Sequence, residues 1–459
     1  MKTLIDNRIL RTTILTLTAL LLFAASALAA TAPKTKRVSV KSNGKEVNTD
    51  NEFASVSANG RYVTFESPGK FTSGDTGGFD VFVHDRVTGK TVRASVKANG
   101  KEVPGADSEF SSISANGRYV AFVSNGRFTK QDKDNYGDVY VKDMKTGKVT
   151  LASLDSNGKQ VPGGAGQPII SANGHSVLFL SDGAYVPTDT NGRTDIYVRD
   201  LTKGTTVRAS LRSDGTESDA DVTSPSISGN GRYVAFQSMD QKMTADPDYG
   251  FAVDSDVFVR DLKTGKTIRA SLKADGTEIS PTQNNANVDP VISANGKFLA
   301  FYSDAYGHYA ADDNNNDYDV YVKNLRNGSL ARASVTSAGN EVTALGGAPQ
   351  SLGASERPLA ISANGRRIAF EAYAALDPID TNMERDVYVH DMKTGQTTLA
   401  SVASKGAVVT SGAGGQQLPA IPGNGKWIAF ETIAKVTGHD ADQGPSTPDF
   451  DVFERGALH

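Results

Sequence analysis

Short apolar runs separated by turn-forming residues recur along the chain. In the string SANGRYVAF, which begins at Ser114, an Asn-Gly pair precedes the run Tyr119 to Val123, which is apolar at nearly every position. Strict alternation would indicate a strand with one face in water, whereas a short continuous run bounded by turn residues is typical of a strand covered on both faces. The pattern therefore predicts an all-β protein built from short strands with both faces covered.

Two strings that contain these runs are each repeated seven times. Copies of the first begin 57 to 69 residues apart, and one copy of the second, of the type DVYVKD, follows each of them. The first string begins at Ser57, Ser114, Ser171, Ser228, Ser293, Ser362 and Pro422, and the second at Asp80, Asp138, Asp195, Asp256, Asp319, Asp386 and Asp451. Repeats of this length indicate one supersecondary unit that recurs around or along the molecule.

Each repeat divides into four short strands, A to D. In the second repeat, strand A ends at Ser114, and the pair Asn116-Gly117 predicts a type I′ hairpin turn with positive φ at both residues. Strand B is the apolar run and strand C is the DVYV segment. A Lys-Thr-Gly turn then leads to strand D, represented in the first repeat by Arg93 to Val96. Four antiparallel strands of this kind form one blade of a β-propeller.

The outermost strand indicates how the ring closes. Strand D follows each of the first six repeats, but little chain remains after the last strand C at Asp451. A spare copy, Arg37 to Val40, stands near the N-terminus and should lie beside Phe450 to Phe453. The sequence thus predicts a seven-bladed β-propeller over residues 37–456, with four-stranded antiparallel blades, closed by the N-terminal strand completing the last blade.

The pattern S-x-[ND]-G-[RK]-x-[VIL]-A-F, followed by D-[VI]-[YF]-V-x-D, resembles the TolB-like, WD40-like propeller repeats of bacteria. It covers nearly the whole chain after residue 37. The resemblance implies the fold but not the function, because propellers serve many unrelated functions. This chain has Ala-Asn-Gly where the family repeats commonly have Pro-Asp-Gly, and its repeats begin at Arg37 without the α/β domain that precedes the propeller of TolB. TolB's partnerships are therefore not transferred to it.

Residues 1–30 have the three-part layout of a secretory signal peptide. Lys2, Arg8 and Arg11 form a basic head, the apolar run Ile14 to Ala25 follows, and small residues predict cleavage near Ala29 or Ala30. The run is shorter than the roughly 20 residues of a transmembrane helix, although an uncleaved anchor is the alternative. We expect a periplasmic or secreted protein with a short linker at residues 31–36 and no membrane span after cleavage.

Composition narrows the classes of function. The chain has no cysteine, which excludes disulfides, thiolate metal sites and thiol nucleophiles. Without residues 1–30 the net charge is −6, which argues against a nucleic-acid partner because such partners require many basic contacts to phosphate. No G-x-S-x-G or H-E-x-x-H motif is present. His84 and His390 occupy a strand C position that is Lys or Arg in other repeats, and we expect them to be exposed and structural.

Loop lengths divide the predicted propeller into two faces. The A–B and C–D turns are short and nearly constant, whereas the B–C and D–A connections are long, variable and, in the B–C loops, acidic. Basic residues such as Arg61 and Arg118 follow the Asn-Gly turns of the first face. Because function concentrates on variable loops held by a constant scaffold, the sequence predicts a non-catalytic scaffold that binds a protein or other envelope macromolecule through its acidic long-loop face.

Four B–C loops share the pattern Asp-x-[Asp/Asn]-x-x-x-Asp. Oxygen ligands at positions 1, 3 and 7 suit Ca²⁺, yet Asp and Asn also shape turns by accepting main-chain hydrogen bonds. The first repeat has only Asp75 and Asp80, and stretched versions begin at Asp246 and Asp440. Both interpretations stay open, as does direct contact of these residues with a ligand, and Ca²⁺ would make the chain a metal-stabilised structural or surface protein. The four sets are Asp132, Asp134 and Asp138; Asp189, Asn191 and Asp195; Asp313, Asn315 and Asp319; and Asp380, Asn382 and Asp386.

Three glutamates break the repeat at the residue after the strand B phenylalanine. Glu66, Glu371 and Glu431 stand there in blades one, six and seven, which are neighbours in a closed ring. Equivalent positions in adjacent blades should lie on the order of 10 Å apart, near the upper limit for an inverting carboxylate pair. They are therefore candidate ligand-binding residues, and the alternative function is a glycan-cleaving hydrolase or lyase. The structural interpretation is that they pair with nearby Lys or Arg or line a polar groove.

Overall fold

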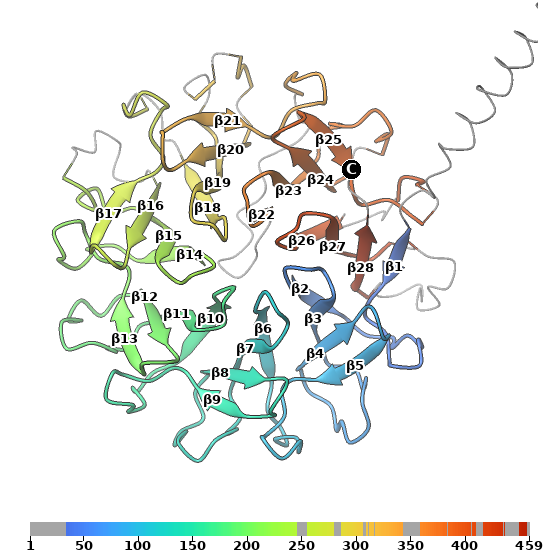
Figure 1. Ribbon diagram of the computed structural model, residues 1–459, viewed down its shortest axis with the longest axis vertical. Helices are drawn as coiled ribbons and strands as arrows, with labels where there is room; N and C mark the ends of the chain where they lie inside the picture. Colours follow the sequence, from blue (N-terminus) through green and yellow to red (C-terminus); the bar gives the residue numbers. More distant parts are fainter. Residues whose placement is uncertain are drawn as a thin grey trace, which may run out of the picture.

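The computed structural model describes residues 34–245, 255–279, 286–305, 309–310, 312–315, 317–342, 359–382, 384–404, 406–409, 416–434, 436 and 449–456. These residues form 28 strands in seven four-stranded sheets, which stand as seven blades around one axis (Figure 1). The predicted propeller is confirmed. The described residues contain no helix that could cross a membrane. The predicted signal peptide, residues 1–30, and most of the predicted linker lie outside them.

The four strands of each blade run from the axis outward as A, B, C and D. Strand A is β2 (Glu52–Val56), β6 (Ser108–Ile113), β10 (Ala165–Ile170), β14 (Val222–Ile227), β18 (Asn287–Ile292), β22 (Leu359–Ile361) and β26 (Gln416–Ala420). Strand B is β3 (Tyr62–Ser67), β7 (Tyr119–Ser124), β11 (Ser176–Ser181), β15 (Tyr233–Ser238), β19 (Phe298–Ser303), β23 (Arg367–Ala372) and β27 (Trp427–Thr432). Strand C is β4 (Asp80–Asp85), β8 (Asp138–Asp143), β12 (Asp195–Asp200), β16 (Asp256–Asp261), β20 (Asp319–Asn324), β24 (Asp386–Asp391) and β28 (Asp451–Gly456). Strand D is β5 (Lys90–Arg93), β9 (Val149–Leu151), β13 (Thr205–Arg208), β17 (Lys266–Arg269), β21 (Leu330–Arg332), β25 (Gln396–Leu399) and β1 (Thr35–Arg37).

The N-terminal strand completes the last blade, as predicted. β1 pairs antiparallel with β28, with Arg37 opposite Phe453. The strand begins at Thr35, two residues before the predicted propeller start, and β5 likewise ends at Arg93, where strand D was predicted to begin. The difference has a physical cause. After Arg93 the Ala94 amide still donates to the Val81 oxygen at 2.8 Å, but the Val81 amide donates to the hydroxyl of Ser95 at 3.0 Å, so a side chain supplies one of the two ladder bonds.

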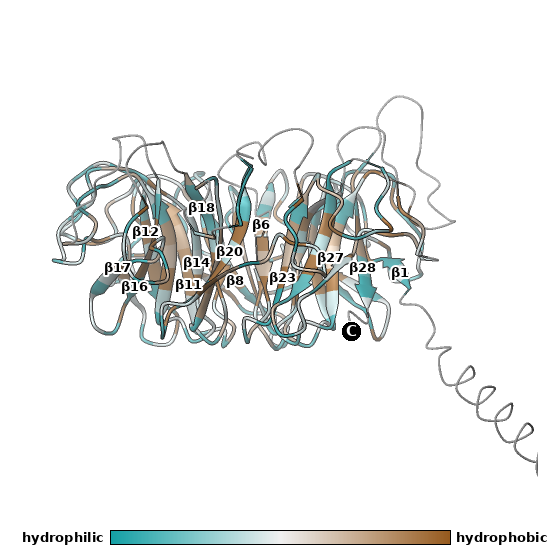
Figure 2. Cartoon of the chain, turned by 90° about the horizontal axis from the view of Figure 1, so that it is seen from above, coloured by the Kyte–Doolittle hydropathy of each residue, from teal (hydrophilic) through white to brown (hydrophobic). Residues whose placement is uncertain are grey.

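The core consists of seven hydrophobic clusters, one between each pair of adjacent blades, including the last and the first. Each strand B contributes a phenylalanine with no exposed surface, such as Phe65 in blade 1 and Phe430 in blade 7. Figure 2 shows the strands running between the two faces of a flat disc, with their hydrophobic stretches inside it. Both faces of each sheet are thus covered, which explains the nearly continuous apolar runs.

The Asn-Gly turns are not of the predicted type I′. Gly60 has a φ of +73°, but no asparagine of the described residues has a positive φ. The Gly60 amide donates to the carbonyl oxygen of Ser57, and the side chain of Asn59 accepts from the amide of Arg61 at 3.0 Å. The prediction was wrong because asparagine was assigned a backbone role, whereas here its side chain shapes the turn.

The strand C position of His84 and His390 is buried, which contradicts the expected exposure. In blades 2 to 5 this position holds a lysine or arginine that reaches main-chain carbonyls of the preceding blade; for example, Lys142 Nζ donates to the oxygens of Val96 and Lys97 at 3.0 and 3.1 Å. His84 and His390 instead contact the hydroxyls of Thr91 and Thr397. Burial lowers the pKa of both histidines. The position therefore joins elements within and between blades.

Candidate functional site

A cavity of about 390 Å³ lies on the propeller axis and is lined by strand A of all seven blades. Figure 1 shows these strands, β2, β6, β10, β14, β18, β22 and β26, around the centre. Strand A has no further strand on its axial side, so proline is tolerated there, as at Pro225 and Pro290 in the cavity wall. The inner wall of the propeller is thus an open strand edge that presents side chains to the cavity.

Strand A is interrupted by a bulge in every blade except blade 6, whose equivalent segment lies outside the described residues. At each bulge the pairing with strand B shifts register and one non-glycine residue has a positive φ of 48° to 55°. Such bulges bend a strand and re-aim its side chains. All six positive-φ residues line the cavity near the start of strand A, toward the long-loop face; they are Phe53, Phe110, Gln167, Ser224, Asp289 and Leu418.

These six side chains divide the cavity wall into two chemically different halves. Phe53, Phe110 and Leu418 form an apolar half, with the two phenyl rings 5.4 Å apart between centroids. Gln167, Ser224 and Asp289 form a polar half, in which the hydroxyl of Ser224 donates to Asp289 at 2.7 Å. Asp289 is the only ionisable residue among the described residues of the wall, and burial raises its pKa. The cavity can therefore bind an apolar group beside a hydrogen-bonding or cationic one.

At the short-turn face the cavity ends against a closed ring of backbone hydrogen bonds. The Ala58 amide donates to the Ala115 oxygen at 3.0 Å, similar bonds continue from blade to blade, and the Asn424 amide returns to the Ala58 oxygen at 3.0 Å. Only small residues fit, since a Cβ on Gly229 would lie 2.9 Å from the Ala294 oxygen. The ring residues are Ala58, Ala115, Ala172, Gly229, Ala294, Ala363 and Gly423. This end is constant scaffold, and the variable end is at the long-loop face.

The three predicted glutamates lie behind the bulges, outside the lining of the axial cavity. Glu66 accepts from the Ser111 amide, Glu371 from the Leu418 amide at 2.6 Å, and Glu431 from the Ala54 amide at 3.0 Å. Each carboxyl group thus joins strand B of one blade to the strand A bulge of the next. All three are buried.

The charge states of these glutamates are set by that burial. Burial raises the pKa of Glu66 to about 8 and that of Glu431 well above its ordinary value, and the negative charges of Glu52, Glu66 and Glu371 raise the pKa of Glu431 further. Glu371 also pairs with Arg385 at 3.3 Å and lines a separate cavity of about 50 Å³ between blades 5 and 6. The predicted pairing with a nearby Lys or Arg therefore holds for Glu371. Glu66 and Glu431 instead accept hydrogen bonds from backbone amides.

Each position of the Asp-x-[Asp/Asn]-x-x-x-Asp pattern makes its own protein contact. The first aspartate accepts from a strand C tyrosine, as Asp313 does from Tyr321 at 2.7 Å, and all four complete patterns coincide with a tyrosine there. The third residue accepts the amide two residues on. The seventh accepts the hydroxyl of the strand D serine, as in every blade. The turn-shaping contacts are present. The stretched patterns at Asp246 and Asp440 lie outside the described residues.

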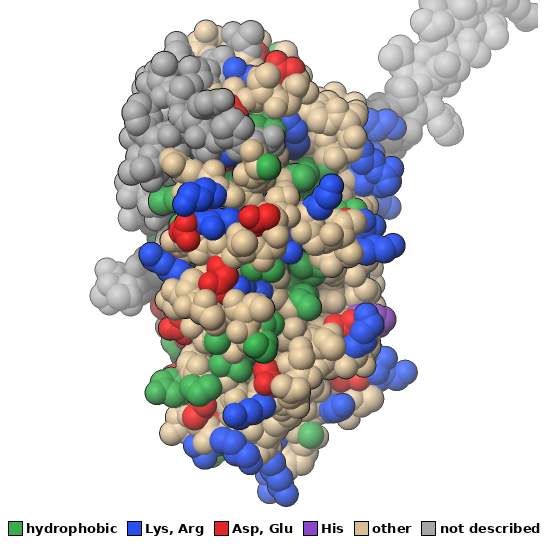
Figure 3. All heavy atoms as spheres, turned by 90° about the vertical axis from the view of Figure 1, so that its left-hand side faces the viewer, with side chains coloured by type: hydrophobic (Ala, Val, Ile, Leu, Met, Phe, Trp, Pro, Cys, Tyr) green, Lys and Arg blue, Asp and Glu red, His purple; other side chains and the backbone are tan. Residues whose placement is uncertain are grey.

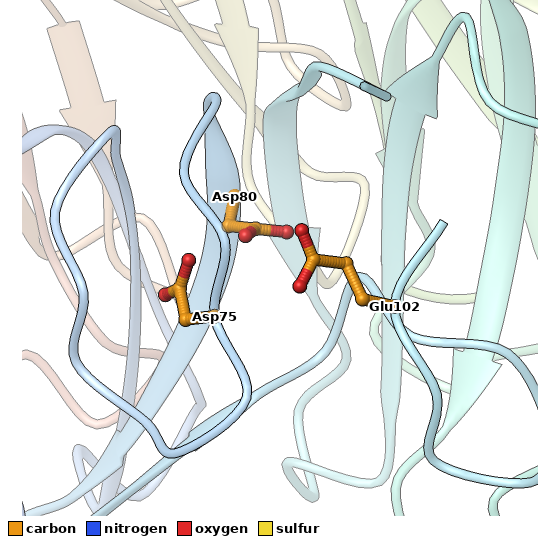
Figure 4. Close-up of side chains that lie close together, drawn as sticks. All are labelled: Asp75, Asp80 and Glu102. Carbon is orange, nitrogen blue, oxygen red and sulfur yellow. The ribbon is translucent and has the colours of Figure 1, made fainter. Parts of the chain in front are cut away.

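Strand D supplies an internal cation to these acids in five blades, a feature that the sequence analysis missed. Figure 4 shows Asp75, Asp80 and Glu102 of blade 1 close together. Arg93 binds them, with Nη1 2.6 Å from Asp80 and 3.5 Å from Asp75, and Nη2 3.1 Å from Glu102. The available signal was the arginine that begins the recurring Arg-x-Ser at the end of strand D. The equivalent arginines are Arg37, Arg93, Arg208, Arg269 and Arg332.

These ion pairs change the predicted charge of both faces. The first aspartates of the four complete patterns are each less than 10% exposed, so they add little charge to the surface of the long-loop face. On the short-turn face, Arg61 pairs with Asp85 at 2.7 Å, and three other blades repeat the pair. Figure 3 shows basic and acidic side chains interspersed on the rim near β13 and β17. The first aspartates of the loop patterns therefore do not make the surface of the long-loop face acidic.

Comparison with known proteins supports the fold. No protein-family model and no curated protein matches the sequence. Similar solved structures include an oligogalacturonate lyase in complex with manganese, 13% identical over 94% of each chain with a TM-score of 0.52, and an oligogalacturonate lyase from Vibrio parahaemolyticus, 11% identical over 93% of this chain and 94% of that one with a TM-score of 0.53. TolB from Acinetobacter baumannii is 13% identical, and the match covers 76% of this chain and 62% of TolB with a TM-score of 0.37.

At these identities the likeness concerns the fold alone. This chain spans less than two thirds of the length of TolB. Together with the seven four-stranded blades, the comparisons confirm the propeller that the resemblance to TolB-like repeats implied.

Proposed function

We propose that the chain is an exported, non-catalytic scaffold that binds a protein or another envelope macromolecule on its long-loop face, with part of that partner entering the axial cavity. The axial cavity is the main support for the proposal. Its volume is about 390 Å³, its side chains vary from blade to blade at the long-loop end, and a constant ring of backbone hydrogen bonds closes it at the short-turn end. A concave, mostly apolar site with a few placed polar groups is the usual form of a binding pocket. Export rests on the signal-peptide pattern of residues 1–30.

The chemistry of the wall supports binding rather than catalysis. Among the described lining residues, Asp289 is the only ionisable group, so the wall holds no acid–base pair. The alternative of a glycan-cleaving enzyme has less support, because Glu66, Glu371 and Glu431 are buried behind the bulges and each holds a backbone amide. A partner segment with an apolar side chain beside a hydrogen-bond donor would suit the two halves of the wall.

A capture experiment with variants of opposite faces tests the proposal. The mature propeller, Phe53→Lys with Phe110→Lys, and Val87→Lys would each be used as bait in an extract of the native cell envelope. The double variant places charge in the apolar half of the cavity, whereas Val87 is 73% exposed on a C–D turn of the short-turn face. Thermal unfolding would confirm that all three baits are folded.

We expect the partner captured by the mature propeller to be retained by Val87→Lys and lost by the double cavity variant. Loss of the partner by Val87→Lys, with retention by the cavity variant, would place the interface on the other face and overturn the proposal. Failure of the folded mature propeller to retain any envelope component would overturn it as well.

A further inference from the structure

The internal cation described above is missing from blades 2 and 6. Strand D pairs with strand C in the same register in each blade, so Arg93 lies opposite Phe82 and Arg208 opposite Tyr197. At this position Leu151 lies opposite Tyr140 in blade 2, and Leu399 lies opposite Tyr388 in blade 6. Both leucines are buried. The strand D position that supplies a guanidinium in five blades therefore supplies a hydrocarbon side chain in these two.

The acid partner of the arginine is lost together with it. In all five blades that have the arginine it binds a glutamate nine residues later, as Arg208 binds Glu217 at 2.9 Å. The residue nine positions after the leucine is Gln160 in blade 2 and Val408 in blade 6. The sequence thus removes one positive and one negative charge at the same site in both blades.

The loop carboxylates are retained nevertheless. In blade 2 the oxygens of Asp132, Asp134 and Asp138 lie within 4.8 Å of one another. The amide nitrogen of Gln160 stands between two of them, 2.7 Å from Asp138 and 3.3 Å from Asp132. The Gln160 oxygen accepts the Lys133 amide at 2.8 Å, so its nitrogen is the group turned toward the acids, and an ion bound between them would take the place of that nitrogen.

Blade 6 gives an independent sign of a missing ligand. Asp386 has no exposed surface, and its Oδ1 accepts from the Ser401 hydroxyl at 2.6 Å. Its Oδ2 is buried and no hydrogen bond of ordinary geometry reaches it from the described residues, although the side chain of Asn382 interacts with the same carboxyl group. The equivalent oxygen in blade 3, Oδ2 of Asp195, lies 3.1 Å from the guanidinium of Arg208. A buried carboxylate oxygen without a donor or cation is costly, so an ion at this point would stabilise the blade.

We propose that blades 2 and 6 each bind a Ca²⁺ ion where the other blades hold the strand D arginine. In blade 2 the ligands are the carboxylates of Asp132, Asp134 and Asp138, and in blade 6 they are Asp380, Asn382 and Asp386. Carboxylate and amide oxygens in an irregular loop suit Ca²⁺ better than Mg²⁺, which requires near-octahedral geometry. The predicted sets in blades 3 and 5 are not proposed as sites, because Arg208 and Arg332 already bind their carboxylates.

Calorimetric titration of the mature propeller, stripped with EDTA, tests the proposal. With CaCl₂ we expect two sites per chain and a melting temperature that rises with ion concentration; MgCl₂ at the same concentration should bind more weakly. The double variant Leu151→Arg with Leu399→Arg restores the internal cation, and we expect it to bind no Ca²⁺ while remaining folded without the ion. If that variant does not fold, Asp138→Asn and Asp386→Asn should each remove one site.

A reciprocal variant uses blade 3 as the matched control. Arg208→Leu leaves Asp189, Asp195 and Glu217 without their cation, and we expect a third Ca²⁺ site. The proposal would be overturned by the absence of both binding heat and melting shift at millimolar Ca²⁺, or by two sites persisting in the folded double variant. A folded Arg208→Leu protein without a third site would equally contradict the idea that the arginine excludes the ion.

Discussion

Glycines of the repeat serve two separate purposes that look identical in the sequence. Gly89, in a C–D turn, has a φ of +70°, and a Cβ added there would meet no atom within 4 Å. Gly117, in an Asn-Gly turn, has a φ of +71°, but a Cβ there would overlap the ring of Tyr62 in the preceding blade. The first glycine is required for its backbone conformation, and the second also for the close packing of two blades.

Replacing each of these glycines by alanine should separate the two effects. Gly89→Ala should lower the free energy of unfolding by about 1–2 kcal/mol, the cost of a left-handed conformation for a residue with a Cβ. Gly117→Ala should lower it by a further 1–3 kcal/mol or so, because Tyr62 must move in a packed interface. Chemical denaturation of both variants measures the difference. Equal losses would show that the contact with Tyr62 does not constrain the turn.

Among the elements, the sequence predicted the strands, their order and the sites of the turns. Runs such as Tyr119 to Val123 are short, apolar and bounded by glycine, so few other structures suit them. The type I′ turn was wrong because Asn-Gly is compatible with more than one backbone geometry, and in each A–B turn only the glycine of the pair, such as Gly60, has a positive φ. The end of strand D was misplaced because Ser95 continues the ladder through its side chain, which no hydrophobic pattern records.

The candidate site was harder to predict. The cavity wall is built by residues of unrelated type, such as Phe53, Gln167 and Asp289, whose positive φ arises at bulges without glycine. The glutamates were found because they interrupt a repeat, but their contacts depend on the bulge of the next blade. The strand D arginine escaped notice because it recurs in five blades, and recurrence was interpreted as scaffold.

The bond between strand B and the next bulge should make stability depend on pH. In the folded protein the pKa of Glu66 is about 8, against an ordinary 4.5, because burial disfavours the charged form. Its contribution to stability is therefore complete below about pH 4.5 and is lost as the pH rises toward 8. Glu66→Gln keeps an oxygen that accepts the Ser111 amide but removes the titratable carboxyl group. Blade 4 has this arrangement naturally, because the Gln237 oxygen accepts the Asp289 amide there.

We expect Glu66→Gln to flatten the decline in melting temperature between pH 5 and pH 8.5, and to be more stable than the unmodified protein by up to roughly 4–5 kcal/mol at the upper end, since each unit of pKa shift is worth about 1.4 kcal/mol. The converse variant Gln237→Glu should steepen the decline. Parallel melting curves for all three proteins across this range would mean that Glu66 stays ionised in the folded chain.

For the molecule as a whole, the seven blades form one closed structure because the first and last parts of the chain share a blade. Val38 is packed with Phe65 of blade 1 and Val452 of blade 7 in one cluster, so the junction is buried like the other interfaces. The Asn51 amide also donates to the Phe450 oxygen at 2.8 Å, which ties the start of blade 1 to the last strand C. If this blade is equivalent to the others, equivalent residues should contribute equally to stability.

Ser39 and Ser95 offer that comparison. Ser39 donates to Asp451 and accepts from the Val452 amide, at 3.0 and 3.3 Å, and Ser95 makes the same two bonds to Asp80 and Val81, at 2.5 and 3.0 Å. Replacing either serine by alanine leaves a buried amide without its acceptor and removes one of the donors to a buried carboxylate, which keeps its arginine, at a cost of about 1–3 kcal/mol. We expect Ser39→Ala and Ser95→Ala to lower the free energy of unfolding by similar amounts in chemical denaturation. A neutral Ser39→Ala beside a destabilised Ser95→Ala would mean that the N-terminal segment does not complete the ring in solution, because only a docked segment can lose these bonds.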